Sequence, residues 1–281
     1  MSYPIALIPI GKIQVMDVGA SMINETPIYK ALMDQGFAHL NAFEGDERQI
    51  EVIKNTYGKN CSIHKEFLFD GNEHTLYLAS PASGMTSLLK PKLSALKFFN
   101  GFENFGHVEK KISVKTVTLD SMDNLASIDF LKMDIQGAEL TALKHGTKKL
   151  SDCLAVQLEV SFTCLYENQP SFGEIDTWMR SQGYAPHCFL EVKRWSIAPT
   201  IFDNNFKIPG NQLLEADIVY IKDPLHIDLL SDESLKKLIT ISHFGFGSID
   251  LCVRLALELE SRGSVPPNTH LNYLNWANSR M

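Results

Sequence analysis

Three carboxylates stand where short apolar runs of the sequence end, and that placement could do chemistry. Asp17, Glu44 and Asp134 each come directly after such a run, and a glycine follows each of them closely. Short apolar runs are typical of buried strands, and open α/β sheets bind their ligands at the carboxyl ends of the strands. We therefore expect the three side chains to lie at one edge of a sheet that binds a polar small molecule.

These groups suit a nucleoside that carries an amino-acid tail. Ribose hydroxyls need a carboxylate acceptor, an ammonium needs an anion, and a carboxylate needs backbone N–H groups. Glu44, with Gly45 beside it, is placed to accept from both ribose hydroxyls, as the acidic residue of dinucleotide sites does. Gly19 and Ala20 let the backbone approach the ligand, because Gly19 has no Cβ. Asp17 is expected to reach the ammonium end through water or a neighbouring backbone group.

Other nucleotide-binding classes lack their phosphate-binding motifs in this sequence. A nicotinamide dinucleotide site normally has a Gly-x-Gly-x-x-Gly turn, but residues 19–24 contain a single glycine. The sequence also has no Gly-x-x-x-x-Gly-Lys-Ser/Thr motif, which disfavours a P-loop nucleotide hydrolase. A nucleotide-sugar-binding enzyme fits the acidic strand ends but would need a pyrophosphate cradle.

Composition and charge narrow the class of protein further. With 44% hydrophobic and 21% charged residues, the 281-residue chain is expected to be a soluble globular protein. The formal net charge of −7 disfavours general binding to nucleic acid or to an anionic membrane. The five cysteines are widely spaced, which predicts buried thiols rather than a disulfide framework or a zinc site, and no metal site is expected. The lack of a basic start or a long apolar run favours a cytoplasmic protein without a membrane span.

The elements that would position the carboxylates alternate along the first part of the chain. Apolar patterning predicts strands at residues 13–16, 37–43 and 61–64, with a helix beginning at Thr26-Pro27 and another over residues 46–57. This βαβαβ order predicts parallel strands joined by right-handed crossovers.

The middle of the chain has a different pattern. A turn at residues 70–73 predicts a hairpin between residues 67–69 and 75–78. Residues 80–107 have no clean periodicity, and we expect a long functional loop there. The next expected strand lies around Val114 and Val117.

The rest of the chain returns to alternating elements and ends in helices. The expected strands are 128–133, 153–160, 184–190 and 216–221, and the last two are expected to form an antiparallel pair. The expected helices are 137–144, 172–181, one that begins at Ser231, 248–261 and a short final segment. We predict an α/β domain over residues 1–224 and a helical extension over residues 225–281. The extension could cover the ligand site or form a homo-oligomer interface.

Several segments of this sequence resemble FkbM-type S-adenosylmethionine-dependent methyltransferases. The resemblance spans about residues 13–222, and its most specific part is the Lys-x-Asp-x-x-Gly-x-Glu pattern of residues 132–139. The other matching segments are residues 17–20, 43–44, 118–120 and 216–220. The resemblance implies a Rossmann-like class I fold with a mostly parallel seven-stranded sheet and an antiparallel late strand. It also implies S-adenosylmethionine as the cofactor and O-methylation of a sugar, a glycan or another hydroxyl-bearing small molecule.

The resemblance extends the set of candidate site residues. In this fold adenine commonly docks after the third strand, where Phe67, Leu68 and Asp70 follow. Asp134 could contact the methionine end of the cofactor, act as the base toward an acceptor hydroxyl, or only accept hydrogen bonds from backbone N–H groups of the next helix. Glu159 ends the fifth strand of the sheet and is a second candidate for the catalytic base.

Two departures from the family pattern support an alternative function. Ile23 stands where the family usually has a second glycine, and Gln136 stands where it often has glutamate. A protein with these changes could keep the methyltransferase fold and bind a nucleoside or the cofactor without efficient transfer. In titrations with S-adenosylmethionine and S-adenosylhomocysteine, no heat and no thermal shift would favour this alternative.

Overall fold

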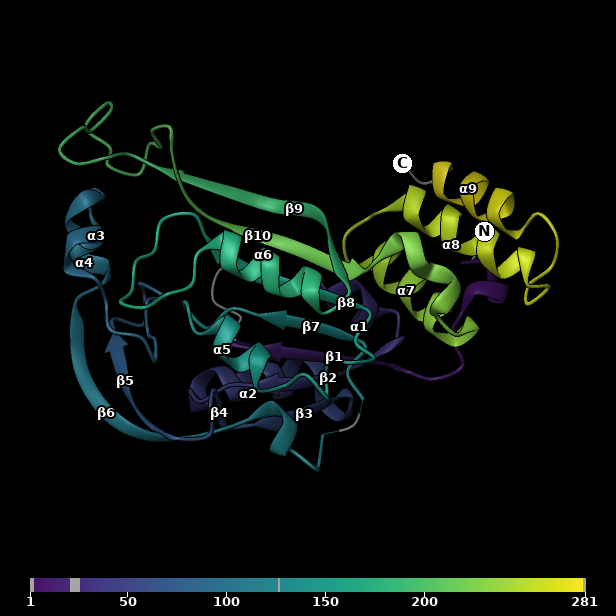
Figure 1. The fold of residues 1–281 in the computed structure, drawn as a ribbon, viewed down its shortest axis with the longest axis horizontal. Coiled ribbons are helices and arrows are strands. Elements are labelled where there is room, and N and C mark those ends of the chain that lie inside the picture. The colour runs from purple at the N-terminus through teal and green to yellow at the C-terminus, as the bar shows by residue number, and fades with distance from the viewer. Residues whose placement is uncertain (1–2, 21–25, 126, 280–281) are drawn as a thin grey trace.

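The computed structural model describes residues 3–20, 26–125 and 127–279, which fold around a seven-stranded sheet (Figure 1). The order across the sheet is β3-β2-β1-β7-β8-β10-β9. Neighbouring strands from β3 to β8 pair in parallel, and β10 pairs antiparallel with β8 and β9. The strands are β1 (Ile13–Val18), β2 (Ala38–Phe43), β3 (Cys61–His64), β7 (Phe130–Met133), β8 (Ala155–Ser161), β9 (Tyr184–Trp195) and β10 (Gln212–Lys222). The predicted Rossmann-like sheet with an antiparallel late strand is confirmed.

Helices on the two faces of the sheet bury separate apolar clusters. One cluster joins β1 and β2 to α1 and the C-terminal helices, and the other joins β7 and β8 to α5 and α6. Asp46 caps α2, because its side chain accepts a hydrogen bond from the Arg48 N–H. The helices next to the sheet are α1 (Lys30–Asp34), α2 (Glu47–Tyr57), α5 (Glu139–Lys144) and α6 (Phe172–Ser181).

The first helix begins later than the sequence predicted. We expected it to begin at Thr26-Pro27, but the N-cap of α1 is Tyr29. The Pro27 carbonyl accepts from the Lys30 N–H at 2.9 Å, so this stretch forms a turn before the helix begins. Residues 26 and 27 are instead part of the lining of the cleft described below.

A second, three-stranded sheet replaces the predicted hairpin. Its order is β4-β6-β5, with β4 (Phe67–Leu68), β5 (Glu73–Ala79) and β6 (Val108–Val117). The hairpin prediction is wrong, because β6 lies between β4 and β5 and pairs with both. The turn itself is present, since the Asp70 side chain accepts from the Asn72 N–H. The expected loop at residues 80–107 also contains two short helices, α3 (Leu93–Phe98) and α4 (Phe102–Phe105).

The C-terminal helices lie at the end of the sheet away from α3, α4 and β5 (Figure 1). They are α7 (Asp232–Phe244), α8 (Ile249–Ser261) and α9 (Thr269–Asn278), and the Ser231 side chain caps α7. Their buried side chains share one apolar cluster with β1 and β2. The division into two domains at residue 224 stays a prediction.

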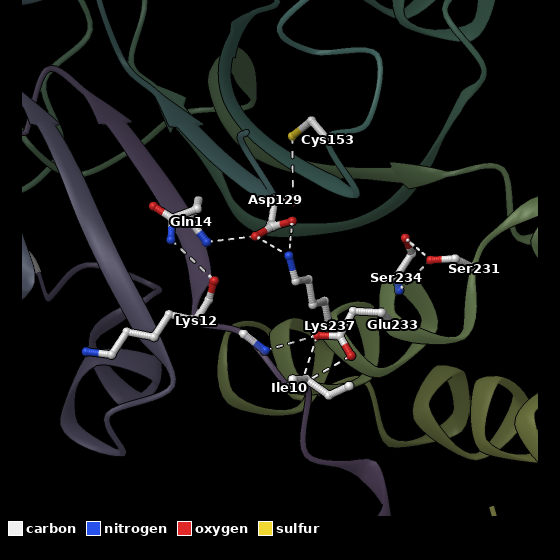
Figure 2. A network of polar contacts seen from close by, with 10 residues as sticks. Ile10, Lys12, Gln14, Asp129, Cys153, Ser231, Glu233, Ser234 and Lys237 are labelled. Atoms are coloured by element: carbon white, nitrogen blue, oxygen red, sulfur yellow. Dashed lines mark hydrogen bonds and ion pairs between the residues drawn. The ribbon is translucent and has the colours of Figure 1, made fainter. Parts of the chain in front are cut away.

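Polar contacts fasten α7 to the start of the central strands (Figure 2). The Lys237 Nζ lies 2.9 and 3.0 Å from the two carboxylate oxygens of Asp129, which directly precedes β7. The same carboxylate accepts from the Gln14 N–H of β1 at 2.8 Å, and Glu233 accepts from the Ile10 N–H. These contacts lie at the amino ends of β1 and β7, and the expectation that the extension covers the ligand site or forms a homo-oligomer interface stays untested.

No helix formed by residues 3–20, 26–125 or 127–279 is both long enough and apolar enough to cross a lipid bilayer.

Candidate functional site

A cleft of about 1380 Å³ opens at the carboxyl ends of the parallel strands. It runs from the loops after β1 and β2, past those after β7 and β8, to the extended ends of β9 and β10. The predicted site residues that line it are Asp17, Gly19, Glu44, Gly45, Phe67, Leu68, Asp134 and Glu159. Residues from distant parts of the sequence therefore line one cleft, as expected for residues at the carboxyl ends of neighbouring strands.

Gly19 brings the loop after β1 against the loop after β7. Its φ is +82°, and a Cβ placed on it would lie 2.1 Å from the Asp134 carbonyl oxygen. The Asp134 N–H in turn donates to the Val18 carbonyl at 3.0 Å. Only glycine fits this position, because both the left-handed backbone and the close approach exclude a side chain. The resulting turn leaves backbone at the cleft surface.

Glu44 presents a half-buried carboxylate at the end of β2. Its Oε1 accepts from the Asp46 N–H at 2.8 Å, which fixes the direction of the side chain. Burial raises the pKa of Glu44, and the N–H groups of Asp46 and Gly45 oppose that rise. Phe67 lies beside Gly45, where a Cβ would lie 3.5 Å from its ring. The arrangement suits a ribose held next to an apolar base subsite.

Asp17 is buried and already has two protein partners. The Tyr29 hydroxyl donates to its Oδ2 at 2.7 Å, and the Lys132 Nζ lies 3.3 Å from its Oδ1. Burial lowers the pKa of Lys132, but the carboxylates of Asp17 and Asp134 outweigh that effect and the net pKa is raised. Asp17 therefore anchors a lysine between two strand ends, and its expected contact with the ligand's ammonium stays a prediction.

Gln136 connects the two candidate bases. Its Nε2 donates to Asp134 Oδ1 at 3.1 Å and to Glu159 Oε2 at 2.9 Å. Its Oε1 accepts from the Tyr166 hydroxyl at 2.8 Å, and its backbone carbonyl accepts from the Ser87 hydroxyl at 2.8 Å. A glutamate at position 136 would place a third carboxylate beside Asp134 and Glu159 and could not donate to them when ionised. The amide of Gln136 can donate to both, which explains why glutamine replaces the glutamate of the family pattern.

The far side of Glu159 faces β9 and β10. The Lys193 Nζ lies 2.9 Å from Glu215 Oε1 and 3.8 Å from Glu159 Oε1. Burial, together with the charges of Asp134 and Glu215, raises the pKa of Glu159 well above its usual range. Burial and the Asp134 charge also raise the pKa of Asp217, which pairs across the strands with Glu159, to about 6. The charge of Lys193 opposes the rise in the pKa of both Glu159 and Asp217.

Glu139 is buried below the cleft and orders the loop after β7. Its Oε1 accepts from the Ile135 N–H at 2.9 Å and from the Gly137 N–H at 3.1 Å. Burial raises the pKa of Glu139 to about 7, although these N–H groups favour its charged form. The residue supports the loop that carries Asp134 and Gln136 and is not a surface ion-pair partner.

Two predicted site residues, Asp70 and Ala20, do not line the cleft. Asp70 accepts from the Asn72 N–H and lies 2.7 Å from His74 Nε2, and these contacts overcome burial and lower its pKa to about 2. The Ala20 side chain is buried, and its N–H donates to the Phe43 carbonyl. Asp70 thus stabilises the turn after β4, and the backbone of Ala20 links the ends of β1 and β2. Their expected cofactor contacts stay untested.

The end of the cleft near α4 has an aromatic wall. Phe102, Phe105 and Trp195 line it, and the rings of Phe102 and Trp195 meet edge-to-face with centroids 5.2 Å apart. The Trp195 Nε1 donates to the Asn100 carbonyl at 2.8 Å, which fixes the indole. Aromatic faces beside carboxylates can hold a small organic molecule by stacking and hydrogen bonds.

Several residues of this site were not predicted from the sequence. The missed cleft residues or their direct partners are Tyr29, Lys132, Tyr166, Lys193 and Asp217. Lys132 shares the alternation that places Asp134 on the cleft side, so its position could have been inferred. Lys193 and Asp217 come to the site through the pairing of β9 and β10, and Tyr29 and Tyr166 come to it from segments outside the strands. Within the described residues, no group of three or more His, Cys, Asp or Glu side chains could hold a metal ion. Ile23 lies outside the described residues.

The strand order, the antiparallel β10 and the cleft at the strand ends define a class I methyltransferase fold. The chain belongs to the FkbM methyltransferase family, because the methyltransferase FkbM domain matches residues 17–186, more than half of the chain. Members of this family use S-adenosylmethionine as the methyl donor. The matched region contains all of the predicted site residues.

Solved structures of low sequence identity also resemble the chain. A methyltransferase FkbM from Methylobacillus flagellatus KT is 13% identical with a TM-score of 0.39, over 74% of this chain and 43% of that one. This chain therefore spans less than half of that protein. Magnesium protoporphyrin IX methyltransferase from Synechocystis PCC 6803 with bound S-adenosylmethionine is 10% identical with a TM-score of 0.38, over 76% and 71% of the two chains. No curated protein matches the sequence.

Proposed function

We propose that this protein is an S-adenosylmethionine-dependent O-methyltransferase that acts on a hydroxyl of a sugar, a glycan or another small molecule. The observation that carries the proposal is that Glu44, the Gly19 turn and Glu159 open into one cleft. A carboxylate for ribose, backbone for the amino-acid tail and a carboxyl for an acceptor hydroxyl are the groups that this reaction needs.

The residues fit the donor at the end of the cleft near β1 and β2. Glu44 would accept from the ribose hydroxyls, and Phe67 and Leu68 would pack against adenine. The open backbone at Gly19, where a Cβ would collide with Asp134, would take the methionine portion. Bound there, the donor supplies an electrophilic methyl group.

The protein's part in the reaction is to align an acceptor and to remove a proton. A hydroxyl held in line with the methyl group, at roughly 3 Å, gains rate from positioning alone. Glu159 is our first choice for the base and Asp134 our second, because the Gln136 amide fixes both carboxyl groups. The aromatic wall of Phe102 and Trp195 would hold the body of the acceptor.

Calorimetric titration with S-adenosylmethionine and S-adenosylhomocysteine tests the donor, and it comes first because it needs no acceptor. We expect both to bind and to raise the melting temperature. Incubation with methyl-labelled donor and a panel of sugars, phenols and amines then tests the acceptor, with the methylated atom identified by NMR. Binding with transfer to nitrogen would contradict O-methylation. No heat and no thermal shift with either compound would contradict the proposed enzyme.

A further inference from the structure

We infer that Glu159 becomes a base only when the positively charged donor is bound, because its carboxyl group keeps its proton in the donor-free cleft. This inference rests on the proposed function and adds to it the way in which the base is controlled.

The surroundings of Glu159 contain more acids than cations. Gln136 donates a neutral amide hydrogen to it at 2.9 Å, and Lys193 is 3.8 Å away but lies closer to Glu215. The amide cannot compensate a charge, because it gives each carboxylate a hydrogen bond and no net charge. The titratable and charged groups around Glu159 are Asp134 after β7, Lys132 on β7, Glu139 on α5, Tyr166 after β8, Lys193 on β9, and Glu215 and Asp217 on β10.

Burial and this charge balance together favour a protonated carboxyl. The Glu159 side chain is 11% exposed, so water stabilises its charged form poorly. Burial is the largest cause that raises its pKa, Asp134 and Glu215 add to the effect, and Lys193 opposes it. A protonated acid cannot accept a proton from an acceptor hydroxyl. A base at this position therefore needs an additional positive charge before the reaction begins.

The methyl donor carries such a charge on its sulfonium sulfur, and the demethylated product does not. On donor binding, the Glu159 carboxyl releases its proton to solvent and becomes a carboxylate. As the O–CH₃ bond forms and the S–CH₃ bond breaks, the electron pair remains on sulfur and Glu159 takes the hydroxyl proton. The protein thus ends the cycle with Glu159 protonated, and the single proton of the overall reaction has left at the donor-binding step.

Calorimetry in two buffers of different ionisation enthalpy measures this proton directly, without an acceptor. At about pH 7 we expect S-adenosylmethionine to release about half a proton to one proton per site, and S-adenosylhomocysteine to release almost none. Glu159→Gln should bind the donor without the release. The matched control Glu167→Gln, at an exposed loop residue outside the cleft lining, should keep it.

Each result separates the inference from the proposed function. Donor binding with equal proton counts for the two compounds would overturn the inference and leave the methyltransferase intact. Release that persists in Glu159→Gln would assign the proton to another group and also overturn the inference. If Glu159→Gln does not fold, infrared difference spectra of the wild-type protein decide: a protonated carboxyl band must disappear with S-adenosylmethionine and remain with S-adenosylhomocysteine. No binding of either compound would refute the proposed function itself.

Discussion

Substitution of Gly19 by alanine tests whether the close contact between the loops after β1 and β7 builds the donor site. The new Cβ would lie 2.1 Å from the Asp134 carbonyl oxygen, and distances under 3.0 Å are essentially never seen for a real Cβ. The loops must therefore separate by about 1 Å, a shift that would also stretch the 3.0 Å hydrogen bond from Asp134 to Val18. The change also forces alanine to adopt a φ of +82°.

Two costs add up in this variant. The left-handed backbone costs about 1–2 kcal/mol for a residue with a Cβ, and the weakened hydrogen bond with the displaced loop adds about 1–2 kcal/mol. A loss of about 3 kcal/mol in the free energy of unfolding corresponds to a fall in melting temperature of about 6–12 °C. Because the displaced loop carries Asp134, we also expect donor affinity to fall by about tenfold or more, as a 1 Å misplacement is costly at a binding site.

Gly183→Ala is the matched control for backbone strain. Gly183 has a φ of +78° with nothing within 4 Å of a Cβ, and it lies outside the lining of the cleft. This variant should lose about 1–2 kcal/mol of stability from strain alone and keep its donor affinity. Thermal unfolding and calorimetric titration measure both variants. Equal losses of stability, with donor affinity unchanged in Gly19→Ala, would refute the argument that this contact shapes the site.

Three further predictions use other parts of the structure. Glu44→Ala should weaken S-adenosylmethionine binding by about 10–100-fold, because hydrogen bonds to a charged group contribute about 1.5–3 kcal/mol, while Glu47→Ala should not; calorimetry measures both. Lys237→Met should lower the free energy of unfolding by about 3 kcal/mol in chemical denaturation, because it leaves the buried Asp129 carboxylate without its cation. Wild-type stability should fall as pH rises from the usual pKa of glutamate to about 7, by up to about 3 kcal/mol from Glu139 alone. In that range native Glu139 keeps a proton that the unfolded chain has lost, so Glu139→Gln should flatten the fall in denaturation measured against pH.

Each of these predictions has a result that contradicts it. Equal donor affinity in Glu44→Ala and wild-type protein would remove the ribose assignment. For the contact in Figure 2, the double variant Lys237→Met/Asp129→Asn should regain part of the lost stability, and a further loss would contradict the charge argument. For Glu139, an equal pH dependence of stability in wild-type protein and Glu139→Gln would show that the native carboxyl is ionised over this range.

The sheet and the edge at which its cleft opens could be predicted because their signals are local. Short apolar runs ending in Asp17, Glu44 and Asp134 indicate strands and their direction without knowledge of any distant contact. Helix α6 and strand β3 have the predicted bounds, because a capping residue, a glycine or a change of periodicity marks their ends. Parallel pairing then follows from the alternation of strands and helices.

The errors came from long-range contacts that outweigh local patterns. A turn at Asp70 indicated a hairpin, but β6, about 40 residues later, takes the pairing positions of both flanking strands. The residues around the candidate base could not be predicted for the same reason. Tyr166 contacts Gln136, and Lys193 lies near Glu159, only in the folded protein. Burial is also the largest cause of the raised pKa of Glu159, and burial of a polar side chain has no sequence signature of its own.

A structure of the protein with S-adenosylhomocysteine is the most direct test of the central claim, that this cleft is the donor site of a methyltransferase. We predict the ribose hydroxyls within hydrogen-bond distance of Glu44, the methionine portion against the Gly19 turn, and the sulfur on the side of the cleft that holds Glu159. A ligand bound elsewhere, or a ribose away from Glu44 with the sulfur turned from Glu159, would contradict the account.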